Sequence, residues 1–245
     1  MLDDPYEGFA ERYDRMKPKD PLRERFFHDL FAKHRVSAVL DCACGTGLDL
    51  ILFDSFGCKV HGSDRSEAML AQARKNIAEA KKNIPLSKVD YRELDKRFEA
   101  EFDAVVCMSN SINECFEDAE VLRALRSIKS VLRTGGILVF DQGQSDAGMK
   151  KPPRFDPAVN DRDFSRLLVM DYSQNVMEVE VFDFIHTQDV FDFKHSSFRI
   201  RIRLKDDWDR ILAGAGFSKV DYAGDWEGSP YDKASSKRLI AVARE

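Results

Sequence analysis

The sequence shows few of the features that mark a membrane protein, a secreted protein or a nucleic-acid binder. No apolar run in its 245 residues approaches the roughly 20 residues that a helix needs to cross a bilayer. The first residues, MLDDPYEGFAERYDRM, are polar and acidic, unlike a secretory signal. A formal net charge of −5 argues against a general nucleic-acid binder, which usually presents a basic face. We therefore expect a cytoplasmic protein without membrane or nucleic-acid partners.

Cysteine and histidine are also scarce, with five of each. The cysteines are odd in number, show no paired metal-ligand spacing, and mostly lie in or beside apolar segments. This pattern predicts reduced, buried thiols. No two histidines share ligand spacing with a carboxylate, so we expect no metal site.

The one dense basic segment is FRIRIRLK, residues 198–205. In a strand, alternation places Arg199, Arg201 and Arg203 on one face and apolar side chains on the other. A solvated strand face is the first interpretation of this pattern, and a polyanion-binding face is the second.

The first half of the chain alternates strand and helix patterns. An amphipathic helix is predicted over residues 20–34. Apolar runs predict strands over residues 38–44, 58–62, 88–91, 102–108 and 137–141, with helices between them. Such alternation predicts an α/β fold with a doubly wound, mostly parallel sheet and helices on both faces.

The pattern changes in the second half. Residues 149–163 contain three prolines and no periodicity, which predicts a loop. Residues 163–204 then give several strand-like runs without a helix, typical of successive antiparallel strands. A helical segment and two strands follow, so a β-rich insert interrupts the α/β fold after its fifth strand.

The strongest single signal is VLDCACGTG, residues 39–47, in which a buried strand runs into Gly-x-Gly and then a helix. Glycine at this junction permits a tight turn and the approach of a ligand. A dinucleotide fingerprint needs a third glycine where this chain has Leu50, and the Lys-Ser/Thr pair of a phosphate-binding loop is absent. The loop therefore favours a ligand with ribose and an amino-acid tail but no phosphate.

Acidic residues follow the next two predicted strands. Asp64 ends the second strand, where a carboxylate can accept both ribose hydroxyls. Asp90 ends the third, within reach of an adenine amino group, and Tyr91 beside it can pack on the ring. The alternatives are a turn residue at Asp64 and a plain surface acid at Asp90.

The chain resembles the class I S-adenosylmethionine-dependent methyltransferases. Five segments carry this resemblance, in this order: VLDCACGTG, SDRSEAML, VDYRELD, FDAVVCMSNSI and LRTGGILVFD. The resemblance implies a Rossmann-like, seven-stranded sheet whose last strand is reversed. It also implies S-adenosylmethionine as cofactor and S-adenosylhomocysteine as product. SNSINECF, the β-rich insert and GDWEGSPY are most similar to the glycine N-methyltransferase and glycine/sarcosine methyltransferase group.

The resemblance also implies roles for single residues. Tyr13 leans over the methionine moiety and Asn110 touches the substrate, so these two are the candidate catalytic residues. The candidate cofactor-binding residues are Tyr13, Ala43, Gly45, Thr46, Asp64, Arg65, Met69, Asp90, Tyr91, Met108 and Ser109. The chain departs from the group at Gly143, which stands where the glycine enzymes carry an arginine that clamps the substrate carboxylate. Arg199 or Arg201 could replace that arginine.

These inferences divide the chain into three parts. Residues 1–145 hold an N-terminal lid segment and the cofactor-binding core, 146–204 the insert that caps the substrate, and 205–245 the last helix and final two strands. The expected function is methyl transfer to a small-molecule acceptor, an amine or amino-acid-like nitrogen nucleophile. A nucleic-acid methyltransferase and a non-catalytic cofactor-binding module are the alternatives. The oligomeric state stays open, with a homo-oligomer as one option.

Overall fold

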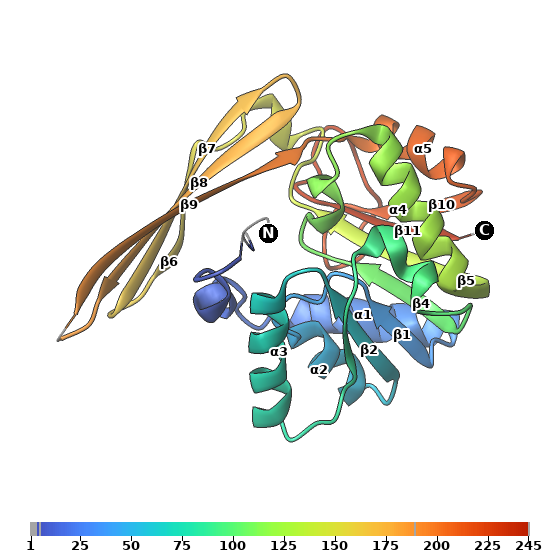
Figure 1. Ribbon diagram of the computed structural model, residues 1–245. Coiled ribbons are helices and arrows are strands. Elements are labelled where there is room, and N and C mark those ends of the chain that lie inside the picture. Colours follow the sequence, from blue (N-terminus) through green and yellow to red (C-terminus); the bar gives the residue numbers. More distant parts are fainter. Residues whose placement is uncertain (1–3, 5, 189, 245) are drawn as a thin grey trace.

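The computed structural model describes residues 4, 6–188 and 190–244 and contains two β-sheets (Figure 1). A seven-stranded sheet with flanking helices forms the body of the molecule, and a long four-stranded sheet projects from it. No helix among the described residues is both long and apolar enough to span a membrane.

The body is built from alternating helices and strands. Its helices are α1 (Pro21–His34), α2 (Leu48–Ser55), α3 (Glu67–Glu79), α4 (Asp118–Val131) and α5 (Lys205–Gly214). Its strands are β1 (Ala38–Asp41), β2 (Lys59–Asp64), β3 (Leu86–Lys88), β4 (Phe102–Cys107), β5 (Leu132–Gln142), β10 (Lys219–Ala223) and β11 (Leu239–Arg244). Short 3₁₀ turns are η1 (Ala10–Met16), η2 (Tyr91–Lys96), η3 (Ser111–Glu114) and η4 (Gly148–Lys150).

The strand order is β10-β11-β5-β4-β1-β2-β3. Strand β11 runs antiparallel to both of its neighbours, and the remaining strand pairs of this sheet are parallel. The chain leaves β1 toward β2 on one side and later returns to β4 on the other, so the order reverses at β1. A ligand crevice is expected at such a reversal, outside the carboxyl ends of the strands. The Rossmann-like fold and its reversed last strand are confirmed.

Alternation along the buried strands separates two apolar layers. In β1, Leu40 packs into the layer that contains Trp208 and Leu125 of α5 and α4. Its neighbour Val39 packs into the opposite layer with Phe27 and Phe53 of α1 and α2. Because both faces of the sheet are covered, its strands read in the sequence as continuous apolar runs.

Caps define the starts of the predicted helices. The Asp20 carboxylate accepts hydrogen bonds from the backbone N–H groups of Leu22 (3.0 Å) and Arg23 (3.3 Å) at the start of α1. Ser66 accepts from Met69 N–H (3.1 Å) at the start of α3, as the sequence predicted.

The five strands predicted in the first half are present, but their bounds differ: β2 covers Lys59–Asp64 instead of 58–62, β4 ends at Cys107 instead of 108, and β5 covers Leu132–Gln142 instead of 137–141. The first strand ends at Asp41 instead of residue 44, because the chain already turns at Cys44, whose carbonyl accepts from Gly47 N–H (2.9 Å). The third strand covers Leu86–Lys88 instead of 88–91, since Asp90 caps the η2 turn by accepting from Arg92 N–H (2.9 Å).

The insert forms a meander in the order β6-β7-β8-β9. Its strands are β6 (Phe155–Asn160), β7 (Phe164–Ser173), β8 (Val176–His186) and β9 (Phe191–Arg201). The expectation of a loop over 149–163 was wrong, because β6 lies within it. Pro157 is compatible with this strand because β6 is at the sheet edge and its register shifts between Asp156 and Val159.

The three arginines of the basic segment do not share one exposed face. Arg203 lies beyond β9, is buried, and donates to the carbonyl oxygens of Cys115 and Phe116 (both 2.9 Å). Burial lowers the pKa of Arg203. Arg199 remains exposed with its guanidinium over the Phe116 ring (5.0 Å to the centroid). Arg203 therefore ties the end of the insert to the body.

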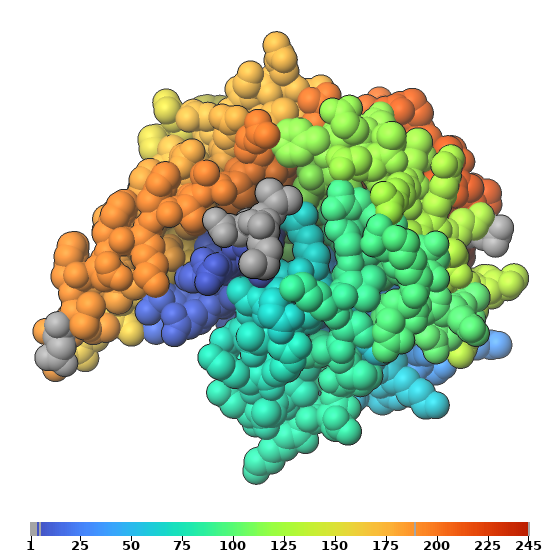
Figure 2. Space-filling model, viewed as in Figure 1, coloured from blue at the N-terminus to red at the C-terminus, as the bar shows by residue number. Residues whose placement is uncertain are grey.

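The N-terminal segment lies between the insert and the body (Figure 2). On the insert side, Arg166 and Asp183 form a buried ion pair with two 2.7 Å hydrogen bonds, and the Phe9 ring covers the guanidinium at 4.0 Å. Arg15 of η1 also pairs with Asp163 (2.8 Å). The insert thus forms one wall of the groove in which the N-terminal segment lies.

A series of glycine substitutions tests the geometry of the loop after β1. Gly47 has φ +80°, and an added Cβ would lie 3.2 Å from the Ala73 Cβ, whereas Gly57 has φ +85° with open space. We expect Gly57→Ala to cost about 1 kcal/mol of unfolding free energy and Gly47→Ala clearly more. Gly143→Ala, without positive φ or a neighbour within 4 Å, should cost almost nothing. Urea unfolding measures all three, and equal losses at positions 47 and 57 would contradict the packing argument.

Candidate functional site

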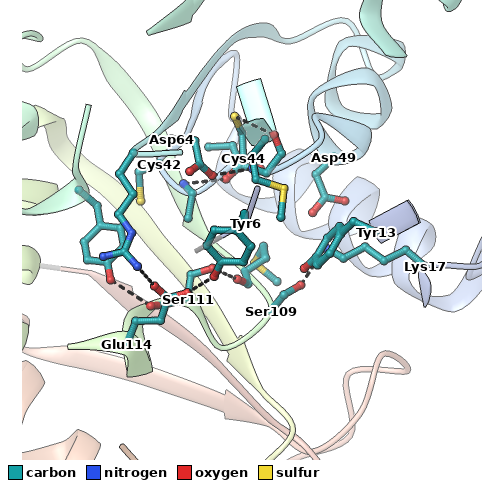
Figure 3. A pocket seen from close by; sticks show the side chains of 17 residues that line it. Tyr6, Tyr13, Lys17, Cys42, Cys44, Asp49, Asp64, Ser109, Ser111 and Glu114 are labelled. Atoms are coloured by element: carbon teal, nitrogen blue, oxygen red, sulfur yellow. Dashed lines mark hydrogen bonds and ion pairs between the residues drawn. The ribbon is translucent and has the colours of Figure 1, made fainter. Parts of the chain in front are cut away.

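A cavity lies at the carboxyl edge of the sheet, where β1, β2 and β4 end (Figure 3). Its walls come from the loop after β1, the ends of β2 and β4, and the N-terminal segment. The predicted residues in its lining are Tyr13, Ala43, Gly45, Asp64, Arg65, Met69, Tyr91, Met108 and Ser109. Thr46, Asp90 and Asn110 are not part of that lining.

Asp64 connects the glycine loop to α3. One carboxylate oxygen accepts from Gly45 N–H (2.8 Å) and the other from Ser66 N–H (2.9 Å). The residue is 9% exposed, and burial raises the pKa of its carboxyl group. Two backbone donors fix the carboxylate at the cavity wall, and each oxygen keeps acceptor capacity for a ligand hydroxyl.

Arg65, Glu114 and Tyr6 form a polar cluster beside Asp64. Arg65 Nη2 lies 2.5 Å from a Glu114 oxygen, and the Tyr6 hydroxyl donates to the other Glu114 oxygen. Tyr91 donates to the carbonyl oxygen of Ser111 (3.0 Å), which orients its ring at the same end of the cavity. Asp90 instead faces Arg92, with 2.6 Å between Arg92 Nη2 and Asp90 Oδ2. Burial alone would raise the pKa of Asp90, but the hydrogen bonds and charge of Arg92 outweigh it, so the pKa is lowered.

The turn after β4 is strained and anchored. Ser109 and Asn110 have φ +60° and +65°, a conformation uncommon for residues with side chains. Ser109 N–H donates to an Asp141 carboxylate oxygen (2.6 Å), and Asn110 Oδ1 accepts from Gly143 N–H (3.1 Å). The turn is therefore fixed to the end of β5, and such strain is commonly stored at functional sites.

Lys17 lies where this cavity meets a second one. Its ammonium group donates to Ser109 Oγ (3.0 Å) and lies 4.9 Å from the centre of the Tyr13 ring. The second cavity, of about 650 Å³, also contains Lys17, Asp49 and Ser109 in its lining.

Sequence reasoning missed eight residues of the first cavity: Tyr6, Lys17, Asp41, Cys42, Cys44, Asp49, Ser111 and Glu114. Glu114 had a local signal, since it stands in the SNSINECF segment that carried the resemblance. Tyr6 and Lys17 come from an N-terminal segment without periodicity, so only the folded chain places them here.

Side chains of the N-terminal segment narrow the first cavity. Figure 3 shows the Tyr6 ring between the strand ends and Glu114. The space left is about 50 Å³, far below the several hundred Å³ of a typical ligand pocket. Asp4 holds the segment at α3 by accepting from Ser66 Oγ (2.8 Å) and Ala68 N–H (3.2 Å). Thr46 also donates to Asp14, which ties the segment to the glycine loop.

Residues 39–136 match the family model described as a methyltransferase domain. The matched residues contain the glycine loop, Asp64 and the turn after β4. A glycine/sarcosine N-methyltransferase of Parasynechococcus marenigrum is 34% identical over 57% of this chain and 51% of its own length. The chain thus spans about half the length of that relative. YqeM of Bacillus subtilis, a protein whose methyltransferase activity is itself only inferred, is 28% identical over 98% of this chain and 97% of its own.

Solved structures extend the likeness beyond residues 39–136. An S-adenosylmethionine-dependent methyltransferase from Clostridium acetobutylicum gives a TM-score of 0.81 at 17% identity, covering 98% of each chain. The sugar N-methyltransferase KedS8 from Streptoalloteichus gives 0.74 at 24% identity, covering 98% of this chain and 93% of that one. Likeness at these identities establishes the fold. The predicted resemblance to S-adenosylmethionine-dependent methyltransferases and to the glycine N-methyltransferase group is confirmed.

Replacing one carboxylate at a time tests the two acidic residues predicted to hold the cofactor. We expect Asp64→Asn to weaken S-adenosylhomocysteine binding about ten- to a hundredfold, because charge-assisted hydrogen bonds are lost. Asp90→Asn should change affinity little, since Asp90 faces Arg92 outside the cavity. Isothermal titration measures both, and a comparable loss in Asp90→Asn would place Asp90 at the adenine instead.

Proposed function

We propose that this chain transfers a methyl group from S-adenosylmethionine to the nitrogen of a small-molecule acceptor and releases S-adenosylhomocysteine. The observation that carries the proposal is Asp64, fixed by Gly45 and Ser66 at the point where the strand order reverses. A carboxylate there suits an unphosphorylated ribose. The methyltransferase domain and the named relatives support the same reaction.

The residues of the first cavity fit such a cofactor. Asp64 would bind the ribose hydroxyls, with Arg65 and Tyr91 at the adenine end. Ala43, Met108 and Ser109 would lie along the methionine portion, with Tyr13 over it and Asp49 and Lys17 near its charged end. When bound, the cofactor supplies an electrophilic methyl group on a sulfonium.

The chain's own part in the reaction is to position and enclose the reactants. The acceptor nitrogen would take up this methyl group and release a proton to solvent, and S-adenosylhomocysteine would leave as the product. Catalysis then depends on holding donor and acceptor in line, roughly 3–3.5 Å apart. In this proposal Asn110, whose side chain accepts from Gly143 N–H, orients the acceptor, and Tyr13 and the N-terminal segment exclude water.

The insert completes the enclosure in this proposal. Residues 146–204 form the cap between the core segments 1–145 and 205–245. Support comes from the buried Arg166–Asp183 pair, which holds Phe9 of the N-terminal segment against the insert.

A combined binding and turnover experiment tests the proposal. We expect the protein to bind S-adenosylhomocysteine and to form it from S-adenosylmethionine when amines and amino acids are offered as acceptors. Asn110→Ala should lower turnover about tenfold or more while leaving cofactor affinity nearly unchanged. Binding without turnover on any amine would favour a non-catalytic cofactor-binding module. Turnover with nucleic acid alone would show that the acceptor is a nucleic acid and not a small molecule.

The Tyr6 contact predicts that the N-terminal segment controls cofactor exchange. Tyr6→Ala should raise both the association and dissociation rates of S-adenosylhomocysteine, because the ring that fills the cavity is removed. Tyr6→Phe keeps the ring and loses only the bond to Glu114, so its effect should be smaller. Stopped-flow mixing measures these rates, and unchanged rates in Tyr6→Ala would contradict a gating role.

A further inference from the structure

The two edge strands of the insert differ in their capacity to pair with a further strand. β6 contains Pro157, which has no N–H group, and its register with β7 shifts between Asp156 and Val159. β9 contains no proline, pairs continuously with β8 from Phe191 to Arg201, and ends the strand order of the sheet. A regular edge strand presents a row of backbone donors and acceptors. β9 is therefore an open edge, whereas β6 is interrupted.

The outer half of β9 lies away from the body. Figure 1 shows the insert projecting from the body, with the turn between β8 and β9 at its free end. In Figure 2 this end, coloured orange, stands clear of the body. Residues 191–195 are all exposed, whereas Ile200 is buried in the cluster that contains Phe9 of the N-terminal segment. The outer half of β9 is thus accessible to a large partner.

This half of β9 is aromatic on the face away from the N-terminal segment. Alternation places Phe191 (79% exposed), Phe193 (49% exposed) and His195 on that face. Phe182 and Phe184 of β8 lie beside them in register. The Phe182 ring stacks on Phe193 (6.1 Å between centroids) and on His195 (5.0 Å). Exposed aromatic side chains on a projecting sheet are typical of a protein interaction surface.

The sequence of this half, FDFKH over residues 191–195, is complementary to itself. Antiparallel pairing about a two-fold axis at Phe193 places Asp192 opposite Lys194 of a second copy, and symmetry repeats this pair on the other side of the axis. Phe193 then faces its own counterpart, and Phe191 faces His195. Opposite charges and aromatic pairs directly across a sheet stabilise strand pairing.

Neighbouring registers lose this match. An axis at Asp192 or at Lys194 would place like charges directly opposite each other, which is unfavourable. An axis at Ser196, midway along β9, would place Asp192 opposite Ile200, which is buried under the N-terminal segment. An axis between two residues would place side chains of one face opposite those of the other, against the pleat of the sheet. Of these registers, the axis at Phe193 pairs both charges.

We propose that the outer half of β9 pairs with the same strand of a second copy, antiparallel and about a two-fold axis at Phe193, so that one sheet runs through both chains. The pairing satisfies backbone groups of the open edge and covers Phe193. A second copy fits better than an unrelated partner because one segment supplies both members of every pair, as a two-fold interface requires. The inference goes beyond methyl transfer and does not depend on it.

Exchanging the charges tests this register. Sedimentation velocity at concentrations up to about 100 μM should show a reversible dimer of the unmodified chain. Asp192→Lys and Lys194→Asp each place like charges opposite one another twice, so each should raise the dimer dissociation constant about ten- to a hundredfold. The double variant Asp192→Lys/Lys194→Asp restores opposite charges and should dimerise again.

Two further samples separate the register from a general effect of charge. An equimolar mixture of the two single variants should form a heterodimer, since each chain carries the charges that the other needs. Asp171→Lys makes the same charge change on β7, where Asp171 is exposed beside Arg154 (3.2 Å), and should leave the dissociation constant unchanged. A monomer at every concentration, or single variants that dimerise as tightly as the unmodified chain, would overturn the inference. A double variant and a mixture that both stay monomeric would overturn the register.

Hydrogen exchange locates the interface on the chain. In the dimer, amides within residues 191–195 should exchange more slowly than in Asp192→Lys, because N–H groups of the open edge gain acceptors. Amides of β6, at the other edge of the sheet, should exchange alike in both samples. Slower exchange on dimerisation that omits residues 191–195 would overturn the placement on β9.

Discussion

The carboxylate of Asp64 is the contact on which the site depends. It lies at the end of β2 and accepts one backbone N–H from the glycine loop and one from the start of α3. Two loops that follow neighbouring parallel strands are thereby fixed to each other. Desolvation of a carboxylate is costly, and the two backbone donors offset that cost. A ribose arriving here would find its acceptor already oriented.

Asp141 likewise fixes two segments to each other, on the other side of β1, where the strand order reverses. It ends β5 and accepts from the turn after β4 through Ser109 and from Arg238 at the start of β11. The site is therefore a row of strand ends connected by two buried carboxylates. The strained backbone at Ser109 and Asn110 is stable in this frame, because both residues are hydrogen-bonded to the end of β5.

Local sequence signals predicted the parts of the site that depend on local structure. The change from an apolar strand to Gly-x-Gly identifies the loop after β1, and an acid at the end of the next strand identifies Asp64. Both features follow from the geometry of a strand–helix turn. Asp90 shows where this reasoning weakens: the third strand has three residues, and the chain turns before the acid reaches the cavity edge. Arg238 and Asp141 lie 97 positions apart, and Lys17 and Ser109 lie 92 apart. No local pattern encodes such pairs, since β-sheet register and the path of an aperiodic segment bring them together.

The insert supports the N-terminal segment from the side opposite the body of the fold. Arg166 is buried with Asp183, and the Phe9 ring stacks on its guanidinium, so the N-terminal segment rests on the insert as well as on α3. Opening the first cavity must therefore break the bonds of the segment to the body, such as those of Tyr6 to Glu114 and of Asp4 to α3, as well as the Phe9 stack on Arg166. The ion pair need not break, because both of its members belong to the insert.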